Sequence, residues 1–442
     1  MPTAMDVYKL LPKKNCGECK FPTCLAFAMQ LANQKVALEA CPYVSPEAKA
    51  ALEESGAPPI RLVTIGTGEL AVKIGDETQL FRHDKTFYHP TMLGLIADDA
   101  DGLDAMKSRI ATAQAMSFER VGQIVRVDSV ALRHSAGRPD DFLEAVKVAA
   151  GGKLPMVVMA EDPKVMREAV ALCAGRNPLL YRATPQNIDD MVALAKACCF
   201  PLVLGGASSL DELAQMADKA KKGGVTDLVL EPASSSAGSM LENMTIVRRA
   251  AVKKKFRPLG FPTLTVLGST EQDLMRGALG VMKYSSVLLM RDVPREFLFP
   301  LMALRQNIFT DPQVPIQVKA GLYTIGEPNE KSPVLLTTNF SLTYFTVRAD
   351  VEKSKLPAWL LVVDTDGQSV MTAFAAGKLT PESVAKAIET EKVKEKSKRN
   401  DIVIPGMVSR MSGKLNELTG LKIVVGPRES SGLPKMLKSL GL

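Results

Sequence analysis

The stretch PLVLGGASSLDELAQMADKAKKGG, residues 201–224, contains the unit from which most of this chain is built. Its first part, PLVLGG, is a short and continuously apolar run, which is typical of a parallel strand buried on both faces. The turn that follows carries Ser209 with Glu212 three residues later, a capping signal for the start of a helix. The remainder has helical periodicity and ends at two glycines. The stretch therefore predicts one βα unit.

This unit recurs eight times between residue 91 and about residue 310, which matches the length and count of a TIM (β/α)8 barrel. A doubly wound open sheet is the alternative. Two short runs, RLVTIG and LAVKIG, followed by ETQLFRH, predict a hairpin-like group of strands before the barrel. The strand candidates of the barrel itself are LGLIAD, GQIVRV, PMVVMA, PLLYRA, PLVLGG, DLVLEP, PTLTVL and SVLLMR.

The chain has a different pattern on each side of the barrel. Before it, PYVSPEAKAALEESGAPPI predicts a short helix and a linker, and after it the Pro- and Gly-rich segment 310–333 predicts an interdomain connection. Four strands follow, VLLTT, WLLVVD, DIVIP and KIVVG, with helical stretches at 341–352, 380–389, 406–418 and 431–440. This alternation predicts an open, Rossmann-like α/β sheet that binds ligands at the carboxyl ends of its strands. The expected domains are 1–58, 59–312 and 313–442.

The overall composition excludes several classes of protein. Of 442 residues, 46% are hydrophobic and 23% are charged, as in ordinary folded soluble proteins. The stretch MPTAMDVYKLLPKK lacks the apolar core of a signal peptide, and no run of eighteen apolar residues occurs, so we expect a cytoplasmic protein without a membrane segment. The net charge of +7 is modest, and the lysine runs lack interleaved aromatic residues, so nucleic acid is not an expected partner.

Four cysteines near the start, Cys16, Cys19, Cys24 and Cys41, have the spacing C-x2-C-x4-C-x16-C. In a reducing compartment such a cluster points to a metal or redox centre. Four thiolates are the standard shell of a 4Fe-4S cluster, whereas zinc sites usually have two short-spaced pairs, and here only Cys16 and Cys19 form one. The spacing favours an iron-sulfur cluster over zinc or over cysteines without a metal. Cys24 begins a predicted helix, CLAFAMQLANQKVAL, and Cys41 follows it.

The two α/β parts differ in what they offer to a ligand. Carboxylates and an arginine at the expected strand ends of the barrel are either substrate anchors or helix caps, and they form no convincing catalytic constellation. In the last domain, the loops 337–346 and 364–378 carry hydroxyl and amide groups that suit a flat or phosphate-bearing cofactor, or ordinary capping. No G-x-G-x-x-G follows a strand, so a dinucleotide is not expected. The strand-end residues are Asp98, Asp99, Asp128, Glu161, Asp162, Arg182, Glu231 and Asp292.

The whole chain resembles the large (gamma) subunit of the corrinoid iron-sulfur protein of the reductive acetyl-CoA pathway. The resemblance rests on YKLLPKKNCGECKFPTCLAFAM with CPYVSP, on the barrel, and on TTNFSLTYF and DGQSVMTAFAAGK near the end. It implies that the four cysteines bind a 4Fe-4S cluster and that the last domain binds a corrinoid. The residues it implies for the corrinoid are Thr338, Asn339, Phe340, Thr343, Thr346, Ser369, Val370, Met371, Thr372, Ala373, Gly432 and Leu433.

The resemblance also implies a function and partners. A methyltetrahydrofolate:corrinoid methyltransferase would deliver a methyl group to cobalt, and acetyl-CoA synthase/CO dehydrogenase would receive it. The cluster would return inactive Co(II) to Co(I), and a smaller subunit would complete a heterodimer. No histidine follows His134 and D-x-H-x-x-G is absent, so we expect a base-off corrinoid without a protein nitrogen ligand. Two alternatives stay open: an iron-sulfur electron-transfer or docking subunit without its own corrinoid, and a barrel that itself catalyses methyl transfer.

Overall fold

The computed structural model describes residues 4–33, 35–45, 48–49, 57–311 and 314–439. The chain divides into two compact units, one of residues 1–80, 91–110 and 128–292 and the other of residues 81–90, 111–127 and 293–442. The first unit contains a barrel and the second contains a five-stranded sheet. Among the described residues, no helix is long and apolar enough to cross a membrane.

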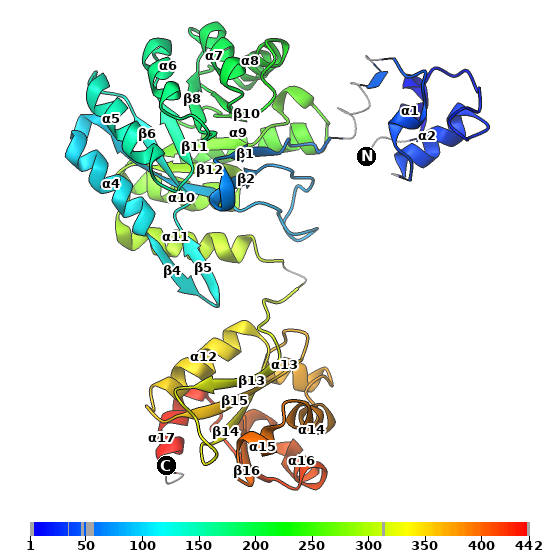
Figure 1. The fold of residues 1–442 in the computed structure, drawn as a ribbon, viewed down its shortest axis with the longest axis vertical. Coiled ribbons are helices and arrows are strands. Elements are labelled where there is room, and N and C mark those ends of the chain that lie inside the picture. Colours follow the sequence, from blue (N-terminus) through cyan, green and yellow to red (C-terminus); the bar gives the residue numbers. More distant parts are fainter. Residues whose placement is uncertain (1–3, 34, 46–47, 50–56, 312–313, 440–442) are drawn as a thin grey trace. The chain divides into compact units, whose positions relative to one another are not determined.

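Eight parallel strands close into a barrel in the first unit (Figure 1). Closure is completed where β12 pairs with β3 and places Val287 beside Met92. The predicted TIM barrel is thereby confirmed, and the open sheet is excluded for this part of the chain. The strands are β3 (Met92–Asp98), β6 (Ser129–Arg133), β7 (Met156–Met159), β8 (Leu179–Ala183), β9 (Leu202–Leu204), β10 (Leu228–Leu230), β11 (Thr263–Leu267) and β12 (Ser285–Met290).

One predicted barrel strand is wrong. GQIVRV forms β5 (Gln123–Arg126), which pairs with β4 (Ser117–Arg120) in a separate antiparallel sheet of two strands. Only one residue of β5 is buried, whereas four of the five residues of β6 are. The run SVALR of β6, directly after GQIVRV, is the one that fits between two parallel neighbours, because a barrel strand must bury both faces.

The helices that alternate with these strands begin where the sequence predicts. Ser209 accepts a hydrogen bond from the Glu212 backbone N–H, and Asp162 and Thr270 cap their helices in the same way. Side-chain caps satisfy N–H groups that have no partner within the helix. The helices are α4 (Leu103–Ala115), α5 (Pro139–Ala150), α6 (Pro163–Ala171), α7 (Ile188–Cys198), α8 (Leu210–Lys222), α9 (Ala237–Val252), α10 (Glu271–Met282) and α11 (Arg295–Ile308).

A hairpin of β1 (Val63–Ile65) and β2 (Val72–Ile74) packs its apolar side chains into the same cluster as inward-facing barrel residues such as Met92 and Val157. The two predicted strands are confirmed, but ETQLFRH contains no strand. Gly75, directly after β2, has φ +86° and the Arg61 carbonyl oxygen only 2.0 Å from the place of a Cβ atom. The hairpin therefore depends on glycine at this position.

The five strands of the second unit have the order β13-β15-β14-β16-β17. β13 is antiparallel to β15, and the other neighbours are parallel. The chain passes from β14 to β15 on one side and then from β15 to β16 on the other side of β14, so its winding reverses between β14 and β16. The strands are β13 (Gly321–Ile325), β14 (Val334–Thr338), β15 (Ala358–Val363), β16 (Asp401–Ile404) and β17 (Lys422–Val425).

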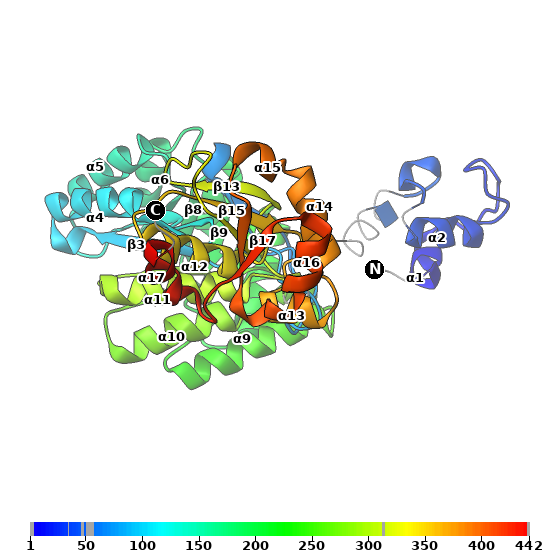
Figure 2. The same ribbon diagram turned by 90° about the horizontal axis from the view of Figure 1, so that it is seen from below.

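Helices cover both faces of this sheet, as Figure 2 shows for β15 and β17. Leu335 of β14 packs in the cluster of the face with α12 and α17, while its neighbours Val334 and Leu336 pack with the helices of the other face. The predicted open α/β domain is confirmed. The helices are α12 (Ser341–Glu352) and α17 (Leu433–Ser439) on one face, and α13 (Val370–Ala375), α14 (Pro381–Thr390), α15 (Val393–Lys396) and α16 (Ser412–Thr419) on the other.

Two segments differ from the expectation. GLYTI, in the predicted connection, forms the edge strand β13; it pairs on one side only and is mostly half-exposed, so it lacks the apolar run of a central strand. Near the start, α1 (Ala4–Leu10) precedes α2 (Cys24–Ala32), which is shorter than predicted. A 3₁₀ helix, Leu38–Ala40, leads to Cys41 instead. Of the helix and linker expected at 42–60, residues 46–47 and 50–56 lie outside the described residues.

The Gly75 contact gives a stability prediction. Replacing Gly75 by Ala should lower the free energy of unfolding by roughly 2–4 kcal/mol, because the new Cβ would meet a backbone carbonyl as well as adopt a left-handed conformation. Gly68→Ala is the matched control: φ is +72° and nothing lies within 4 Å of the Cβ position, so only the conformational cost of about 1–2 kcal/mol remains. Urea unfolding compares the two variants, and equal losses would contradict the role of the contact.

Candidate functional sites

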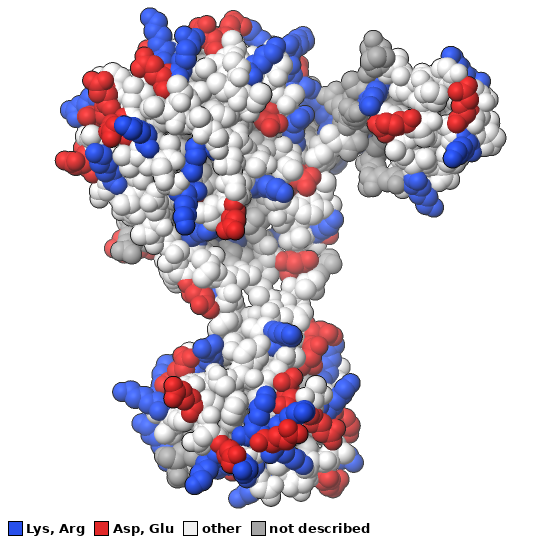
Figure 3. Space-filling model, viewed as in Figure 1, with Lys and Arg blue, Asp and Glu red and all other residues white. Residues whose placement is uncertain are grey.

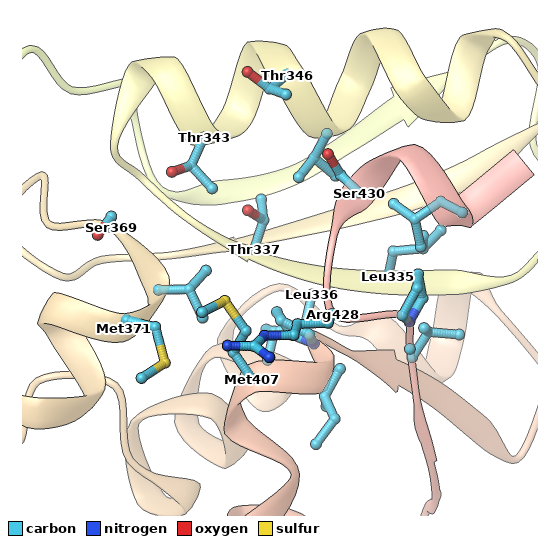
Figure 4. Close-up of a pocket in the computed structure, with 18 of the residues that line it drawn as sticks. Leu335, Leu336, Thr337, Thr343, Thr346, Ser369, Met371, Met407, Arg428 and Ser430 are labelled. Carbon is cyan, nitrogen blue, oxygen red and sulfur yellow. The ribbon is translucent and has the colours of Figure 1, made fainter.

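A cavity of about 430 Å³ opens at the carboxyl ends of β14 and β16 (Figure 4). It lies where the winding of the sheet reverses, the place at which open α/β sheets bind ligands. Apolar residues of both strands, Leu335, Leu336, Val403 and Ile404, line its inner part. The other walls come from α12, the start of α13, and the segment after β17. The topology of the sheet thus creates the cavity, and the loops that follow the strands supply its specific groups.

One hydroxyl in this cavity lacks a partner. Thr337 is 1% exposed, and its Oγ1 forms no hydrogen bond within the described structure. By contrast, the hydroxyl of Thr346 donates to a backbone carbonyl at 2.7 Å, and that of Ser430 donates to Asp350 at 2.6 Å. A buried hydroxyl without a partner costs about 1–3 kcal/mol. A ligand group that bonds Thr337 would remove this cost, so the cavity is suited to a ligand with polar substituents.

The mouth of the cavity combines apolar and cationic groups. Met371 and Met407 are 44% and 41% exposed, and Arg428, also exposed, lies between them and Thr337 in Figure 4. Methionine side chains adapt to irregular ligand surfaces, and an arginine can bind a phosphate through two parallel hydrogen bonds. The mouth therefore fits a large ligand that has both an apolar body and an anionic group.

Half of the residues predicted for the corrinoid line this cavity. Thr372 and Gly432 are adjacent in the chain to lining residues, and Phe340 and Ala373 lie two residues from one, but none of the four lines the cavity. Thr337 lies in the candidate ligand loop 337–346 but was not among the predicted contacts, and Arg428 and Ser430 were missed, although GPRESSG directly follows a strand, where ligand contacts are expected. The predicted residues that do line the cavity are Thr343, Thr346, Ser369, Val370, Met371 and Leu433.

Two of the predicted residues, Thr338 and Asn339, are buried at the end of β14 instead. The Asn339 side-chain oxygen accepts hydrogen bonds from the Thr365 backbone N–H, the Thr365 hydroxyl and the Gly367 N–H, all at 3.0 Å. Its amide nitrogen donates to Asp364 at 2.9 Å and to Gln317 at 3.1 Å. Asn339 therefore fixes the loop after β15, which leads directly to the cavity residues at the start of α13.

The four cysteines lie in one small domain. Cys19, Cys24 and Cys41 are buried in a single cluster with apolar side chains that include Phe27, whereas Cys16 is exposed. The Asn15 N–H lies 3.4 Å from the Cys24 sulfur, and the Asn15 side-chain oxygen accepts from the Cys24 N–H at 2.8 Å. Asn15 thus holds the start of the cysteine loop against the start of α2.

The backbone and donor set of this loop fit an iron-sulfur cluster. Lys13, Asn15, Gly17 and Lys20 have φ values of +56°, +50°, +76° and +66°. Such left-handed residues occur in the backbone concavities whose N–H groups bind anions and Fe–S clusters. All four candidate ligands are thiols, as Fe–S clusters require.

The strand-end carboxylates of the barrel bind neighbouring groups. Asp99 is buried, which by itself would raise its pKa, but backbone N–H groups of Ser135, Ala136 and Arg138 and the ring of His134 hold that pKa below its ordinary value. These contacts join the turn after β3 to the turn after β6. Asp99 therefore has a structural role in fastening two loops.

Arg182 and Glu231 form an ion pair at the same end of the barrel, and the Tyr181 hydroxyl donates to Glu231 at 2.9 Å. Burial raises the pKa of Glu231, although Arg182 opposes this effect. Gly205 leaves room for the pair, since a Cβ atom there would lie 2.3 Å from a Glu231 oxygen. Asp128, expected at a strand end, instead precedes β6 and accepts from the Leu93 N–H at 2.8 Å, because the second barrel strand was misplaced.

The remaining strand-end residues are also engaged. Asp98 lies 3.3 Å from Arg291 and 3.6 Å from Arg133, and Glu161 and Asp292 bind arginines at 2.9 Å. Asp162 caps α6. The mouth of the barrel thus consists of carboxylates matched to arginines, to backbone N–H groups or to both.

Comparison with known proteins identifies the family. Residues 62–437 match the family described as "CO dehydrogenase/acetyl-CoA synthase delta subunit", and residues 11–43, with all four cysteines, match "Putative Fe-S cluster". The corrinoid/iron-sulfur protein large subunit of Moorella thermoacetica is 46% identical over 434 residues, or 98% of this chain and 97% of that protein. This chain belongs to the corrinoid/iron-sulfur protein large subunit family. The predicted family is thereby confirmed.

More distant members extend the corrinoid/iron-sulfur large subunit family to archaea. The acetyl-CoA decarbonylase/synthase complex subunit gamma of Methanothermobacter thermautotrophicus is 34% identical over 452 residues, which cover 99% of each chain. Among solved structures, a dihydropteroate synthase from Thermus thermophilus is 19% identical and covers 55% of this chain and 97% of its own, with a TM-score of 0.37. That last likeness is too low to support a functional conclusion.

The Asn339 hydrogen bonds predict an effect on the cavity. Asn339→Ala should weaken retention of a corrinoid about tenfold or more, because the loop after β15 loses several buried hydrogen bonds of about 1 kcal/mol each. Asn329→Ala is the control, since Asn329 bonds Lys331 and Ser332 before the amino end of β14, whereas the cavity lies at the carboxyl end. Cobalt content and amide hydrogen exchange of residues 364–371 are the measurements. Equal effects of both substitutions would contradict the positioning role.

Proposed function

We propose that this chain is a methyl-group carrier, in which a bound corrinoid accepts a methyl group from methyltetrahydrofolate and donates it to acetyl-CoA synthase. A separate methyltransferase supplies the methyl group, and a 4Fe-4S cluster returns Co(II) to Co(I). The observation that carries the proposal is the cavity at the reversal between β14 and β16, in a chain that is 46% identical to a corrinoid/iron-sulfur protein large subunit. We further propose three functional domains, 1–58, 59–312 and 313–442.

The residues around the cavity have the chemistry to hold a corrinoid. The hydroxyls of Thr337, Thr343 and Ser369 would bond the amide side chains of the macrocycle, and Arg428 would pair with the phosphate of its nucleotide loop. Met371 and Met407 provide apolar surface at the mouth. When bound, the corrinoid supplies a cobalt centre that gains and releases a methyl group.

The absence of histidine from the last domain bears on the cobalt ligand. The chain has three histidines, at 83, 89 and 134, and none lies in residues 313–442, which contain the sheet and its cavity. This domain therefore supplies no imidazole to cobalt, which supports a base-off corrinoid. Electron-rich Co(I) disfavours a strong axial donor. Reduction of cobalt to Co(I) is therefore easier when the protein provides no histidine ligand.

The cysteine domain would hold the cluster through Cys16, Cys19, Cys24 and Cys41. The cluster, when bound, supplies single electrons at low potential. The N–H of Asn15 donates toward the Cys24 sulfur, and such bonds stabilise negative charge on an iron-sulfur centre. The proposed partners are a smaller subunit, since the Moorella relative is named a large subunit, the methyltransferase, and acetyl-CoA synthase/CO dehydrogenase.

Metal analysis of variants tests this function. Thr343→Trp should fill the cavity and lower the cobalt content several-fold with the iron content unchanged, while Ala349→Trp, on an exposed part of the same helix, should change neither. Cys24→Ser should lower iron and spare cobalt. The measurements use anaerobically purified heterodimer, for which about four irons and one cobalt are expected.

The same preparation tests methyl transfer. The absorbance of the wild-type corrinoid should change to that of its methylated form when methyltetrahydrofolate and the methyltransferase are added, and revert with acetyl-CoA synthase. Iron without cobalt in the wild-type protein would favour the electron-transfer alternative. Methyl transfer that persists without cobalt would favour a catalytic barrel.

A further inference from the structure

The cysteine loop contains three lysines that form no ion pair with a carboxylate in the described part of the chain. Lys13, Lys14 and Lys20 are exposed and flank Cys16 and Cys19 in the chain. Within the described part of the chain, none of these lysines forms an ion pair. Two other lysines of the same domain do, Lys9 with Asp6 at 3.9 Å and Lys49 with Glu39 at 3.3 Å. Figure 3 shows lysine side chains projecting from the rim of this domain.

Aromatic rings hold two of these lysines in place. The Lys14 ammonium lies 4.0 Å from the centroid of the Tyr43 ring, and that of Lys13 lies 5.6 Å from the Tyr8 ring. The carboxylate of the loop, Glu18, accepts a hydrogen bond from the Tyr43 hydroxyl at 2.7 Å. A cation–π contact orients an ammonium group without cancelling its charge. The loop therefore keeps its positive charge available to an incoming group.

Tyr43 connects this charged surface to the cysteines. Tyr43 follows the candidate ligand Cys41 by two residues, its hydroxyl donates to Glu18 of the cysteine loop, and the Lys14 ammonium lies over its ring. Cys16, between Lys14 and Lys20 in the chain, is the exposed cysteine of the set.

We propose that Lys13, Lys14 and Lys20 form a docking patch for a small electron-transfer protein with a negatively charged surface. The inference rests on the proposed function, in which the cluster returns Co(II) to Co(I). That reduction consumes one electron, which must come from outside the chain. A reduced carrier loses one electron, the oxidised cluster gains it, and no bond or proton changes. Complementary charge speeds such brief encounters and fixes their orientation.

The size and chemistry of the patch suit a transient complex. Weak redox encounters bury little surface and depend on charge more than on apolar contact. Tyr43, whose ring the Lys14 ammonium covers, is 41% exposed and provides a small apolar surface beside that lysine. Three lysines on so small a domain match a cluster of carboxylates on a partner.

Charge removal with a matched control tests the patch. The variant Lys13→Gln/Lys14→Gln/Lys20→Gln is compared with Lys253→Gln/Lys254→Gln/Lys255→Gln, which removes the same charge from three exposed lysines after α9. The probe is a reduced ferredoxin of net negative charge, and the protein is the anaerobic heterodimer with its cofactors. Calorimetry at several salt concentrations gives the dissociation constant, and stopped-flow absorbance gives the rate of cluster reduction.

The cysteine-loop variant should bind the ferredoxin about tenfold more weakly at low salt, with a flatter salt dependence, and should be reduced more slowly. The control variant should bind as the wild type does. Both variants should keep the wild-type cluster potential and the same rate of reduction by reduced methyl viologen, because the lysines act on the protein partner.

Three results would overturn the docking patch: unchanged ferredoxin binding by the cysteine-loop variant, a shifted cluster potential with unchanged binding, or loss of the small subunit from the complex. The fate of the methyl-carrier function is separate. A wild-type protein that lacks cobalt yet binds ferredoxin through these lysines would refute the carrier and keep the patch. Normal methyl transfer by a protein whose ferredoxin binding does not depend on these lysines would support the carrier and refute the patch.

Discussion

Each connection between two parallel strands crosses one face of the sheet. Where two successive connections cross opposite faces, neither of them covers the carboxyl ends of the strands between them. In the last domain that position lies between β14 and β16, because β14 leads to β15 on one side and β15 leads to β16 on the other. The cavity at their carboxyl ends follows from this constraint. Leu335 and Leu336 are neighbours in β14 that pack on opposite faces of the sheet, and both line the cavity. The cavity is therefore reached from both faces of the sheet.

The polar groups near this cavity divide into two kinds. Asn339 uses both its oxygen and its nitrogen within the protein, so it can stabilise a loop but has little capacity left for a ligand. Thr337, two residues earlier, has a buried hydroxyl with no partner in the described structure. The strand end therefore supplies one side chain that organises the site and another that is open to a ligand. The sequence placed both residues in one candidate ligand loop, but the predicted corrinoid contacts included Asn339 and not Thr337, because burial and hydrogen bonding are not visible in residue type.

The barrel could be predicted because its unit is local: an apolar run, a capped turn and an amphipathic helix lie within about twenty-five residues. The errors arose at segments whose place in a sheet depends on which distant strands they pair with. GQIVRV has an apolar run that satisfies a strand pattern, but only the adjacent SVALR is buried between two parallel neighbours. GLYTI joins an edge by pairing with β15 and needs no apolar run of its own. Likewise, Arg428 reaches the cavity only because β17 lies next to β16.

The charged groups of the chain bear on why we propose binding functions for its two ends and not for the barrel. At the mouth of the barrel, Arg182 meets Glu231 and Arg291 meets Asp98, so a ligand there would have to separate partly buried ion pairs. Breaking a buried pair costs about 3–5 kcal/mol, which opposes binding before any contact is gained. Within the described residues, the lysines of the cysteine loop form no ion pair and the hydroxyl of Thr337 forms no hydrogen bond. A ligand or protein that approaches these groups gains interactions without displacing such contacts, which favours binding at these groups over binding at the mouth of the barrel.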